Sequence, residues 1–233
     1  MKSESALMFT APARDCPLCP RLAGFRKAQH HAHADWFNAP VPSFGDAAAR
    51  LLIVGLAPGL KGANRTGRPF TGDFAGALLY ATLIKFGLAR GEFRADPRDG
   101  LQLMDALITT AVRCVPPENK PLPAEIATCN RFLRAQIDAL PALSAIVALG
   151  RIAHDAVLAA LALRKSVYSF GHGAVHDLGG LRLFDSYHCS RYNTNTGVLT
   201  PAMFESVFAA ARAHIDANRA STSSASRPGL GTG

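Results

Sequence analysis

The chain has 233 residues, of which 48% are apolar and 18% charged, and its 25 lysines and arginines against 17 aspartates and glutamates give a net charge of +8. This composition excludes wholesale disorder, collagen and coiled coil, and the length allows one large domain or two small ones. The basic excess fits a polyanionic partner such as nucleic acid, but an Arg-rich composition alone would also produce it. The longest apolar stretch, residues 51–60, contains glycine and proline and is too short for the ~20 residues of a membrane span.

The N-terminal segment does not have the pattern of a secretory signal. Lys2 is offset by Glu4, and the apolar piece before Pro12 is too short for a signal core. We therefore expect a cytoplasmic protein. The five cysteines have unequal spacings, and in a chain of this length they do not indicate a disulfide framework.

Strand and helix patterns alternate along the chain. In the first half of the chain they predict a capped helix and a loop within 16–37, a strand at 50–55, a helix at 73–89 with Asp73 as its N-cap, and a strand near 107–112. In the second half they predict a helix at 124–139, a strand at 145–150, a helix at 151–163 and a short strand at 182–186. The last element is a helix that begins after Thr200 and ends near Arg219. This alternation implies an α/β fold in which helices cover both faces of a parallel sheet. We expect residues 1–219 to form one domain and the Ser/Gly/Thr-rich residues 220–233 to form a flexible tail.

Three polar loops follow predicted strands, after Gly55, Val112 and Ser186. Because the carboxyl ends of parallel strands meet at one edge of a sheet, the three loops are expected to converge on a single crevice.

The first of these loops is rich in glycine but matches no phosphate-binding motif. Lys61 lies between Leu60 and Gly62, which breaks the P-loop pattern, and no GxGxxG is present. What remains is a backbone that a ligand can approach closely.

The cysteines leave three interpretations open from spacing alone. Cys16 and Cys19 form a CxxC pair, whereas Cys114 and Cys129 are too far apart for a zinc-ribbon knuckle. A four-iron four-sulfur cluster, a zinc site and unliganded thiols all remain possible. The histidines at 30, 31 and 33 do not share one helix face, which favours a solvated segment over a metal tract.

Four ordered motifs together resemble those of the iron–sulfur uracil-DNA glycosylases, and within that superfamily the family 5, or type B, enzymes. They are GLAPG at 55–59, GANRTGRPFTGD at 62–73, VRCVPPENKP at 112–121 and SYHCSRYNTNTG at 186–197. The resemblance covers residues 16–219. It implies a three-layer α/β/α sandwich with a short, mainly parallel central sheet, and a 4Fe-4S cluster held by Cys16, Cys19, Cys114 and Cys129. Cys189 falls outside that set, at a position where the family's histidine motif commonly has proline.

The resemblance also implies a reaction. Such an enzyme flips a damaged nucleotide out of DNA and hydrolyses the N-glycosidic bond of uracil, or of other deaminated or damaged bases, leaving an abasic site. His188 is expected to hydrogen-bond the leaving base, and Asp73 to stabilise the sugar cation or orient water. Asp73 also serves as an N-cap in the simpler interpretation, and the two roles are compatible.

The remaining site residues follow from the same motifs. Phe70 is expected to stack on the flipped base and Asn119 to read its edge, although a core phenylalanine and a turn asparagine are the simpler alternatives. Gly55, Ala57 and Gly59 would surround the base. Ala57 stands where other branches of the superfamily carry an acidic or amide residue, which argues against a family 4 enzyme.

The expected partner is double- or single-stranded DNA with damaged bases, bound by a monomer associated with the nucleoid and not with a membrane. Arg191 or Tyr192 would fill the gap left in the duplex. The residues expected to contact DNA are Arg65, Arg68, Ser190, Arg191, Tyr192 and Asn193. The alternative is a non-catalytic iron–sulfur module that binds nucleic acid or senses redox state.

Overall fold

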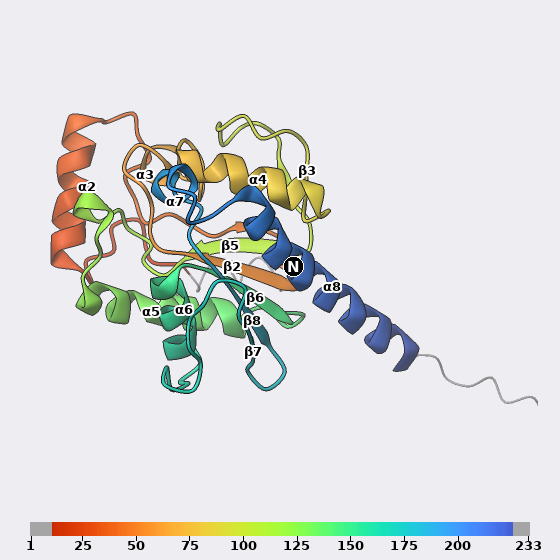
Figure 1. Ribbon diagram of the computed structural model, residues 1–233. Coiled ribbons are helices and arrows are strands. Elements are labelled where there is room, and N and C mark those ends of the chain that lie inside the picture. The colour runs from red at the N-terminus through yellow and green to blue at the C-terminus, as the bar shows by residue number, and fades with distance from the viewer. Residues whose placement is uncertain (1–10, 226–233) are drawn as a thin grey trace, which may run out of the picture.

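The computed structural model describes residues 11–225, in which a central sheet is flanked by helices (Figure 1). The helices are α2 (Pro20–Ala32), α3 (Ala63–Thr66), α4 (Phe74–Lys85), η1 (Pro117–Asn119), α5 (Pro123–Asp138), α6 (Arg151–Ala160), α7 (Arg191–Asn195) and α8 (Pro201–Ala225). The strands are β1 (Phe44–Gly45), β2 (Leu51–Gly55), β3 (Ala89–Arg90), β4 (Gln102–Leu103), β5 (Ala106–Thr110), β6 (Ala145–Leu149), β7 (Val175–Asp177) and β8 (Arg182–Ser186). No helix in residues 11–225 is long and apolar enough to cross a membrane.

The main sheet of the described residues has six strands in the order β1-β5-β2-β6-β8-β7. The four central strands run parallel, and the short strands β1 and β7 pair antiparallel at the two edges. Gly55 of β2 pairs with Thr110 of β5, and Leu149 of β6 pairs with Ser186 of β8. The carboxyl ends of these strands therefore lie along one edge of the sheet.

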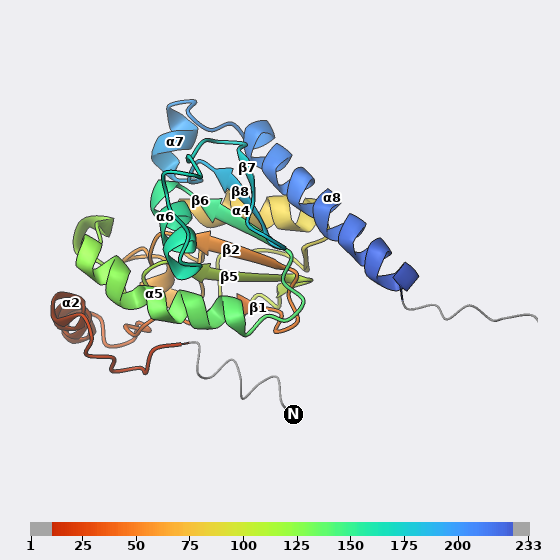
Figure 2. The ribbon, with the colours of Figure 1, turned by 90° about the horizontal axis from the view of Figure 1, so that it is seen from below.

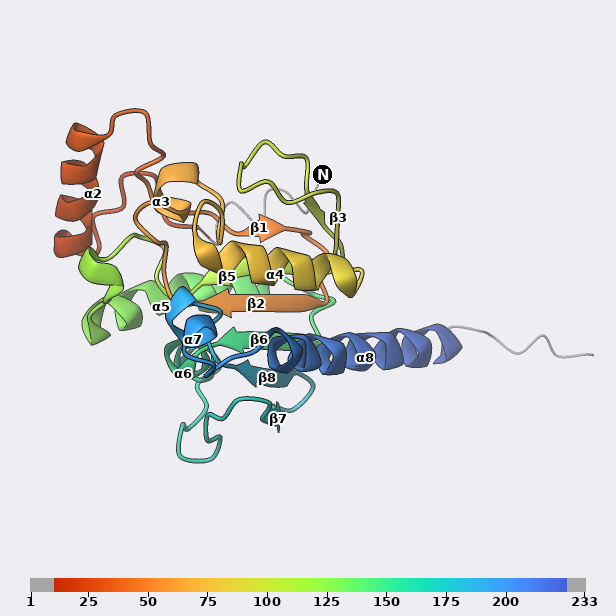
Figure 3. The same ribbon diagram turned by 45° about the horizontal axis from the view of Figure 1, so that its top comes forward.

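Alternate residues of the central strands face two separate apolar layers, as expected for a sheet buried on both sides. Leu51 and Ile53 of β2 belong to the layer that includes α4 and α8, whereas Leu52 and Val54 belong to the layer that includes α5 and α6. Figure 3 shows α4 and α8 over one face, and Figure 2 shows α5 and α6 over the other. The predicted α/β/α sandwich is confirmed.

Helix ends differ from the sequence-based expectation where the backbone turns left-handed. The helix that begins at Phe74 ends at Lys85 because Gly87 has φ +66°, and α6 ends at Ala160 shortly before Ala162 at φ +57°. In the other direction, α8 continues to Ala225 and extends away from the sheet (Figure 1), so the end predicted near Arg219 was wrong. The remainder of the predicted tail, residues 226–233, lies outside the described residues.

Candidate active site

A cavity of about 670 Å³ lies where the loops after β2, β5 and β8 meet, as predicted from the sequence. Most of its wall is apolar, with a few polar groups that converge on one space, which is the usual character of a small-molecule site. Its polar and aromatic lining comprises Lys61, Phe70, Asp73, Phe74, Thr110, Asn119, His188, Ser190 and Arg191.

Phe70 forms part of the wall in a backbone conformation that phenylalanine rarely adopts. Its φ is +52° and its side chain is 8% exposed. A methyl group on Gly55 would lie 2.7 Å from the Cζ atom of Phe70, so this strand end must be glycine for the ring to fit. Gly55 therefore shapes the cavity through Phe70 and does not line it, whereas Ala57 and Gly59 do.

His188 lies beside Phe70, with the two ring centroids 6.0 Å apart and their planes 29° apart. Burial lowers the pKa of His188 to about 4, because the cavity wall excludes water from the charged form. The imidazole is therefore neutral at pH 7. The Nδ2 of Asn193 donates a hydrogen bond of 2.8 Å to the carbonyl oxygen of His188, which fixes the backbone that carries the ring.

Asp73 occupies the N-cap position of α4, as predicted, although its side chain does not complete a capping hydrogen bond. The carboxylate lies against the backbone of Gly62, where an added Cβ would overlap it, and it remains open to the cavity on its other side. Burial by the surrounding loop raises the pKa of Asp73, an effect that the nearby N–H groups of Gly76 and Ala75 oppose. The site thus places a carboxylate and a neutral imidazole on one cavity.

Asn119 reaches the cavity from the loop after β5. It is exposed and follows Glu118, and both residues have positive φ, +57° for Asn119 and +55° for Glu118. Asparagine tolerates this left-handed conformation better than most residues. The turn therefore brings Asn119 to the cavity that Phe70 and His188 also line.

The residues predicted to contact DNA fall into three groups. Arg65, Arg191 and Tyr192 are exposed, with Tyr192 at 73%, and the Arg191 guanidinium lies 5.3 Å from the ring centroid of Phe74 at the cavity rim. Ser190 caps α7 by accepting a hydrogen bond from the backbone of Asn193 and also lines the cavity. Asn193 directs its side-chain amide inward to the His188 backbone.

Arg68 was assigned to DNA contact from the sequence, and this prediction was wrong. Its side chain is 5% exposed, and its Nη1 and Nη2 atoms donate to both carboxylate oxygens of Asp99 at 2.8 and 2.7 Å. The Nε atom donates to Thr71 at 2.7 Å, so every face of the guanidinium is used internally. The loop from β3 to β4 supplies the partner and removes Arg68 from the surface.

The four cysteines predicted to act together lie around one recess, between α2, the loop after β5, and α5. The recess is lined by Cys16, Cys19, Cys114 and Cys129, of which Cys114 and Cys129 are buried. The Nη1 of Arg26 donates to the Sγ of Cys114 at 2.9 Å, and the backbone N–H of Arg113 donates to the Sγ of Cys129 at 3.3 Å. Cys189 packs in the layer below the active site instead, with its Sγ 3.5 Å from the carbonyl oxygen of Ala75.

The sulfur positions distinguish between two kinds of metal group. Around one tetrahedral zinc ion, thiolate sulfurs lie about 3.8 Å apart, given a zinc–sulfur bond of ~2.3 Å. No three cysteine sulfurs of the described residues lie within 4.8 Å of one another. The recess therefore fits a larger inorganic group better than a single zinc ion.

Comparison with known proteins agrees with this site. Residues 42–212 match the family model described as the uracil DNA glycosylase superfamily. The chain belongs to the uracil-DNA glycosylase superfamily. It is 48% identical over 211 residues to the type-5 uracil-DNA glycosylase of Thermus thermophilus, covering 88% of this chain and 95% of the relative. It is 39% identical over 190 residues to the type-5 uracil-DNA glycosylase of Pyrobaculum aerophilum, an alignment that covers 80% of this chain and 83% of the relative.

Type-4 members of the superfamily are more distant. The type-4 uracil-DNA glycosylase of Archaeoglobus fulgidus is 32% identical over 139 residues, covering 59% of this chain and 62% of the relative. The resemblance to family 5 stated from the motifs is thus confirmed, and Ala57 in the cavity wall agrees with it.

Some residues of the cavity did not emerge from the sequence as site residues. Lys61 was considered only as part of a failed phosphate motif, and Phe74 was not singled out within the helix predicted at 73–89, yet both line the cavity. The available signals were that Phe74 follows Asp73 directly and that Lys61 lies within the glycine-rich loop. Thr110, at the end of β5, gave no signal because it continues a buried strand.

Proposed function

We propose that this chain hydrolyses the N-glycosidic bond of uracil in DNA, leaving an abasic site, and that it accepts other deaminated or damaged bases in the same cavity. The observation that carries this proposal is the placement of Asp73, a neutral His188 and Phe70 on one cavity at the carboxyl edge of the sheet. Superfamily membership supports the reaction class.

Phe70 and Asn119 bind the flipped base. The Phe70 ring, held by its packing against Gly55, offers a flat apolar surface on which a base stacks. The Asn119 amide has both a donor and an acceptor for the polar edge of a pyrimidine. Ala57 contributes no polar group, so the wall near it does not select against bases with different exocyclic groups.

Bond cleavage separates charge, and the cavity is arranged to stabilise both products. As the bond from the sugar C1′ to the base lengthens, the sugar becomes cationic and the base becomes an anion. His188 is neutral and donates an N–H to the carbonyl oxygen of the departing base, so it acts as a hydrogen-bond donor and not as a strong acid. The Asp73 carboxylate stabilises the sugar cation and orients the water whose oxygen adds to C1′, while the proton of that water passes to solvent.

The rim of the cavity binds the DNA. Exposed Arg65 and Lys61 contact phosphates and release counterions, so affinity falls as salt rises. Tyr192, the most exposed large apolar side chain of the described residues, enters the vacated stack together with Arg191. The chain acts as a monomer on duplex or single-stranded DNA in the cytoplasm, at the nucleoid.

Cys16, Cys19, Cys114 and Cys129 would hold a 4Fe-4S cluster, whose role would be structural. When bound, it ties α2 to the loop after β5 and to α5. The residues fit such a group because two buried arginines, Arg26 and Arg113, 6% and 1% exposed, interact with the cysteines: Arg26 donates to the Sγ of Cys114, and the charge of Arg113 acts on Cys129 and Cys114. Burial lowers the pKa of Arg113 to about 10, with the thiol groups of Cys129 and Cys114 opposing the shift, and the side chain still carries a proton at pH 7. Their positive charges offset the thiolates that a cluster requires.

The deciding experiment is release of base from a duplex that contains one uracil, followed by cleavage at abasic sites. Wild-type protein is expected to release uracil under single-turnover conditions, whereas Asp73→Asn and His188→Ala lose rate far more than they lose DNA affinity. A protein that binds the duplex but releases no base, and whose affinity follows the oxidation state of its iron, would instead be the non-catalytic module. Equal losses of rate and binding in the variants would contradict the assigned roles.

A further inference from the structure

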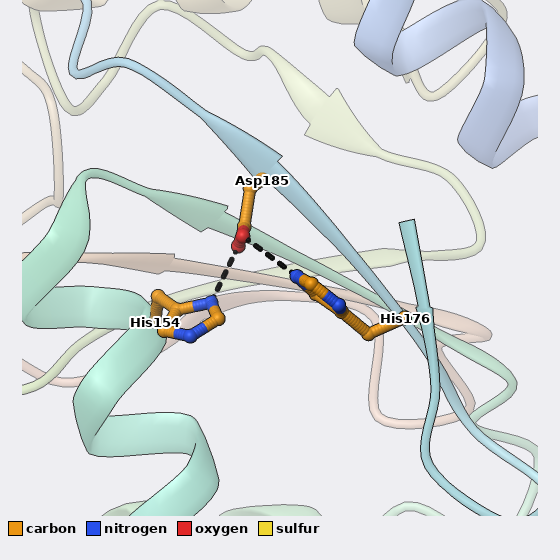
Figure 4. A group of neighbouring side chains, drawn as sticks. All are labelled: His154, His176 and Asp185. Carbon is orange, nitrogen blue, oxygen red and sulfur yellow. Dashed lines mark hydrogen bonds and ion pairs between the residues drawn. The ribbon is translucent and has the colours of Figure 1, made fainter. Parts of the chain in front are cut away.

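A second cluster of ionisable side chains lies outside the cavity, at the sheet edge formed by β8 and β7. It consists of His154 on α6, His176 on the edge strand β7, and Asp185 on β8 (Figure 4). None of the three lines the active-site cavity. The side chains of Asp185 and His154 are 0% and 1% exposed, and that of His176 is 14% exposed.

The two imidazoles approach one carboxylate from different elements. Nδ1 of His154 lies 2.8 Å from Oδ1 of Asp185, and Nε2 of His176 lies 3.1 Å from Oδ2 (Figure 4). The three potential ligand atoms lie within 4.8 Å of one another, and this is the only such group of three among residues 11–225.

The second nitrogen of His154 restricts what can lie between the ring and the carboxylate. Nε2 of His154 is 3.0 Å from the carbonyl oxygen of Tyr168, and only a protonated nitrogen can donate to a carbonyl. A neutral ring with its hydrogen on Nε2 directs the lone pair of Nδ1 at a carboxylate oxygen, which also carries negative charge. The pair therefore requires a positive charge between them, either an additional proton or a metal ion.

Three features point to the metal ion. Two imidazoles and a carboxylate are a donor set that Zn²⁺ and related divalent cations bind, with one coordination position left open. A hydrogen bond from the other ring nitrogen to a backbone carbonyl is the arrangement that metal-ligating histidines usually have, and His154 has it. The partial exposure of His176 on an edge strand provides an entry path. We propose that His154, His176 and Asp185 bind one divalent cation of the zinc type.

The position of this cation gives it a structural role. It joins α6, β7 and β8, and Asp185 lies on β8 next to its last residue, Ser186, after which the chain leads directly to His188. The cation fixes the edge hairpin and the end of the strand from which the catalytic loop departs. This proposal is independent of the reaction assigned to the cavity.

The test counts zinc in the purified holoprotein. Wild type, His176→Gln and the control His214→Gln are briefly treated with a chelator, incubated with Zn²⁺ alone and desalted, and zinc and iron are measured per chain. His176 is chosen because it is the least buried of the three, and His214 because it is a half-buried histidine outside the triad, whose Nε2 contacts the Ser144 carbonyl and Asn218.

Wild type and His214→Gln are expected to retain one zinc ion per chain more than His176→Gln, with equal iron in all three. Zinc bound elsewhere, including at the four cysteines, is common to the three proteins and cancels. The midpoint of thermal unfolding should rise with Zn²⁺ in wild type and His214→Gln but not in His176→Gln. Equal zinc in wild type and His176→Gln, or an equal thermal response, would overturn the proposal and leave the triad as a hydrogen-bonded His–Asp–His group.

Discussion

The side-chain amide of Asn193 donates a hydrogen bond of 2.8 Å to the backbone carbonyl of His188. This contact joins the first turn of α7 to the residue that faces the base, so α7 positions the imidazole. A side chain that the sequence assigned to DNA contact thus points to the interior of the site.

Asn193→Ala should lower the single-turnover rate of uracil release about tenfold, because the His188 backbone loses its only fixed donor from α7 and the ring leaves its productive position. DNA affinity should change little. Asn195→Ala, an exposed asparagine on the same helix, is the matched control and should behave as wild type. A parallel loss of affinity and rate would mean that Asn193 contacts DNA directly.

Gly55→Ala should impair base binding while the protein stays folded. The added methyl group would lie 2.7 Å from Cζ of Phe70, so the ring has to move into the cavity. We expect inhibition of the reaction by free uracil to weaken at least tenfold, and the rate of uracil release from DNA to fall as well. Gly24→Ala, where no atom lies within 4 Å of the added methyl group, is the control. Unchanged uracil inhibition in Gly55→Ala would exclude Phe70 as the stacking surface.

Asp99→Asn should destabilise the fold by about 3–5 kcal/mol, the usual cost of breaking a buried ion pair. Hydrogen bonds from Arg68 hold the pKa of Asp99 well below its usual range. A depressed carboxyl pKa contributes stability above the unfolded value, and this stability is lost as the pH falls below about 4. Chemical denaturation at pH 7 and at pH 3 measures both effects.

Replacement of the Arg68 guanidinium distinguishes a structural from a DNA-binding role of this side chain. Arg68→Lys should reduce the free energy of unfolding without changing the salt dependence of DNA affinity, since the guanidinium is buried. Arg65→Ala should leave the free energy of unfolding unchanged and reduce the salt dependence of DNA affinity, since Arg65 is exposed. A smaller salt slope in Arg68→Lys would restore the sequence-based assignment.

The activity should fall at acidic pH, between about 5 and 4. His188 has its pKa lowered to about 4 by burial, so it is neutral above that value and becomes an imidazolium below it. The imidazolium repels the sugar cation and places a charge in a wall that excludes the water needed to solvate it. The pH dependence of the single-turnover rate and the NMR titration of the His188 ring test this. Titration of the ring near 6.5 would contradict the buried environment.

Cys114→Ser should lose iron and the visible absorbance of the protein, because the recess then lacks one thiolate. Cys189→Ser should keep both, since that thiol packs against Ala75 in the layer below the cavity. Iron analysis of the two purified variants is sufficient. Equal iron in Cys114→Ser and wild type would remove this cysteine from the ligand set.

The central strands and the convergence of their loops were predictable because local patterns determine them. Residues 51–55 and 145–149 are continuous apolar runs, and such runs have few alternatives to a buried strand. The fate of Arg68 was not predictable, since its partner Asp99 lies 31 positions away in a loop without periodicity. The triad of His154, His176 and Asp185 was also invisible, because only strand pairing brings His176 of β7 to Asp185, and only the packing of α6 on the sheet brings His154 there.

The left-handed backbone of Phe70 has a consequence for how substrates are selected. Holding a phenylalanine at φ +52° is unfavourable by about 1 kcal/mol or more, and the surrounding core meets that cost during folding. The aromatic surface is then already oriented when a nucleotide leaves the duplex. Discrimination among bases therefore depends on how readily each one unstacks from DNA and on whether it fits a rigid cavity. Lesions that weaken base pairing are thus favoured before any contact with the enzyme is made.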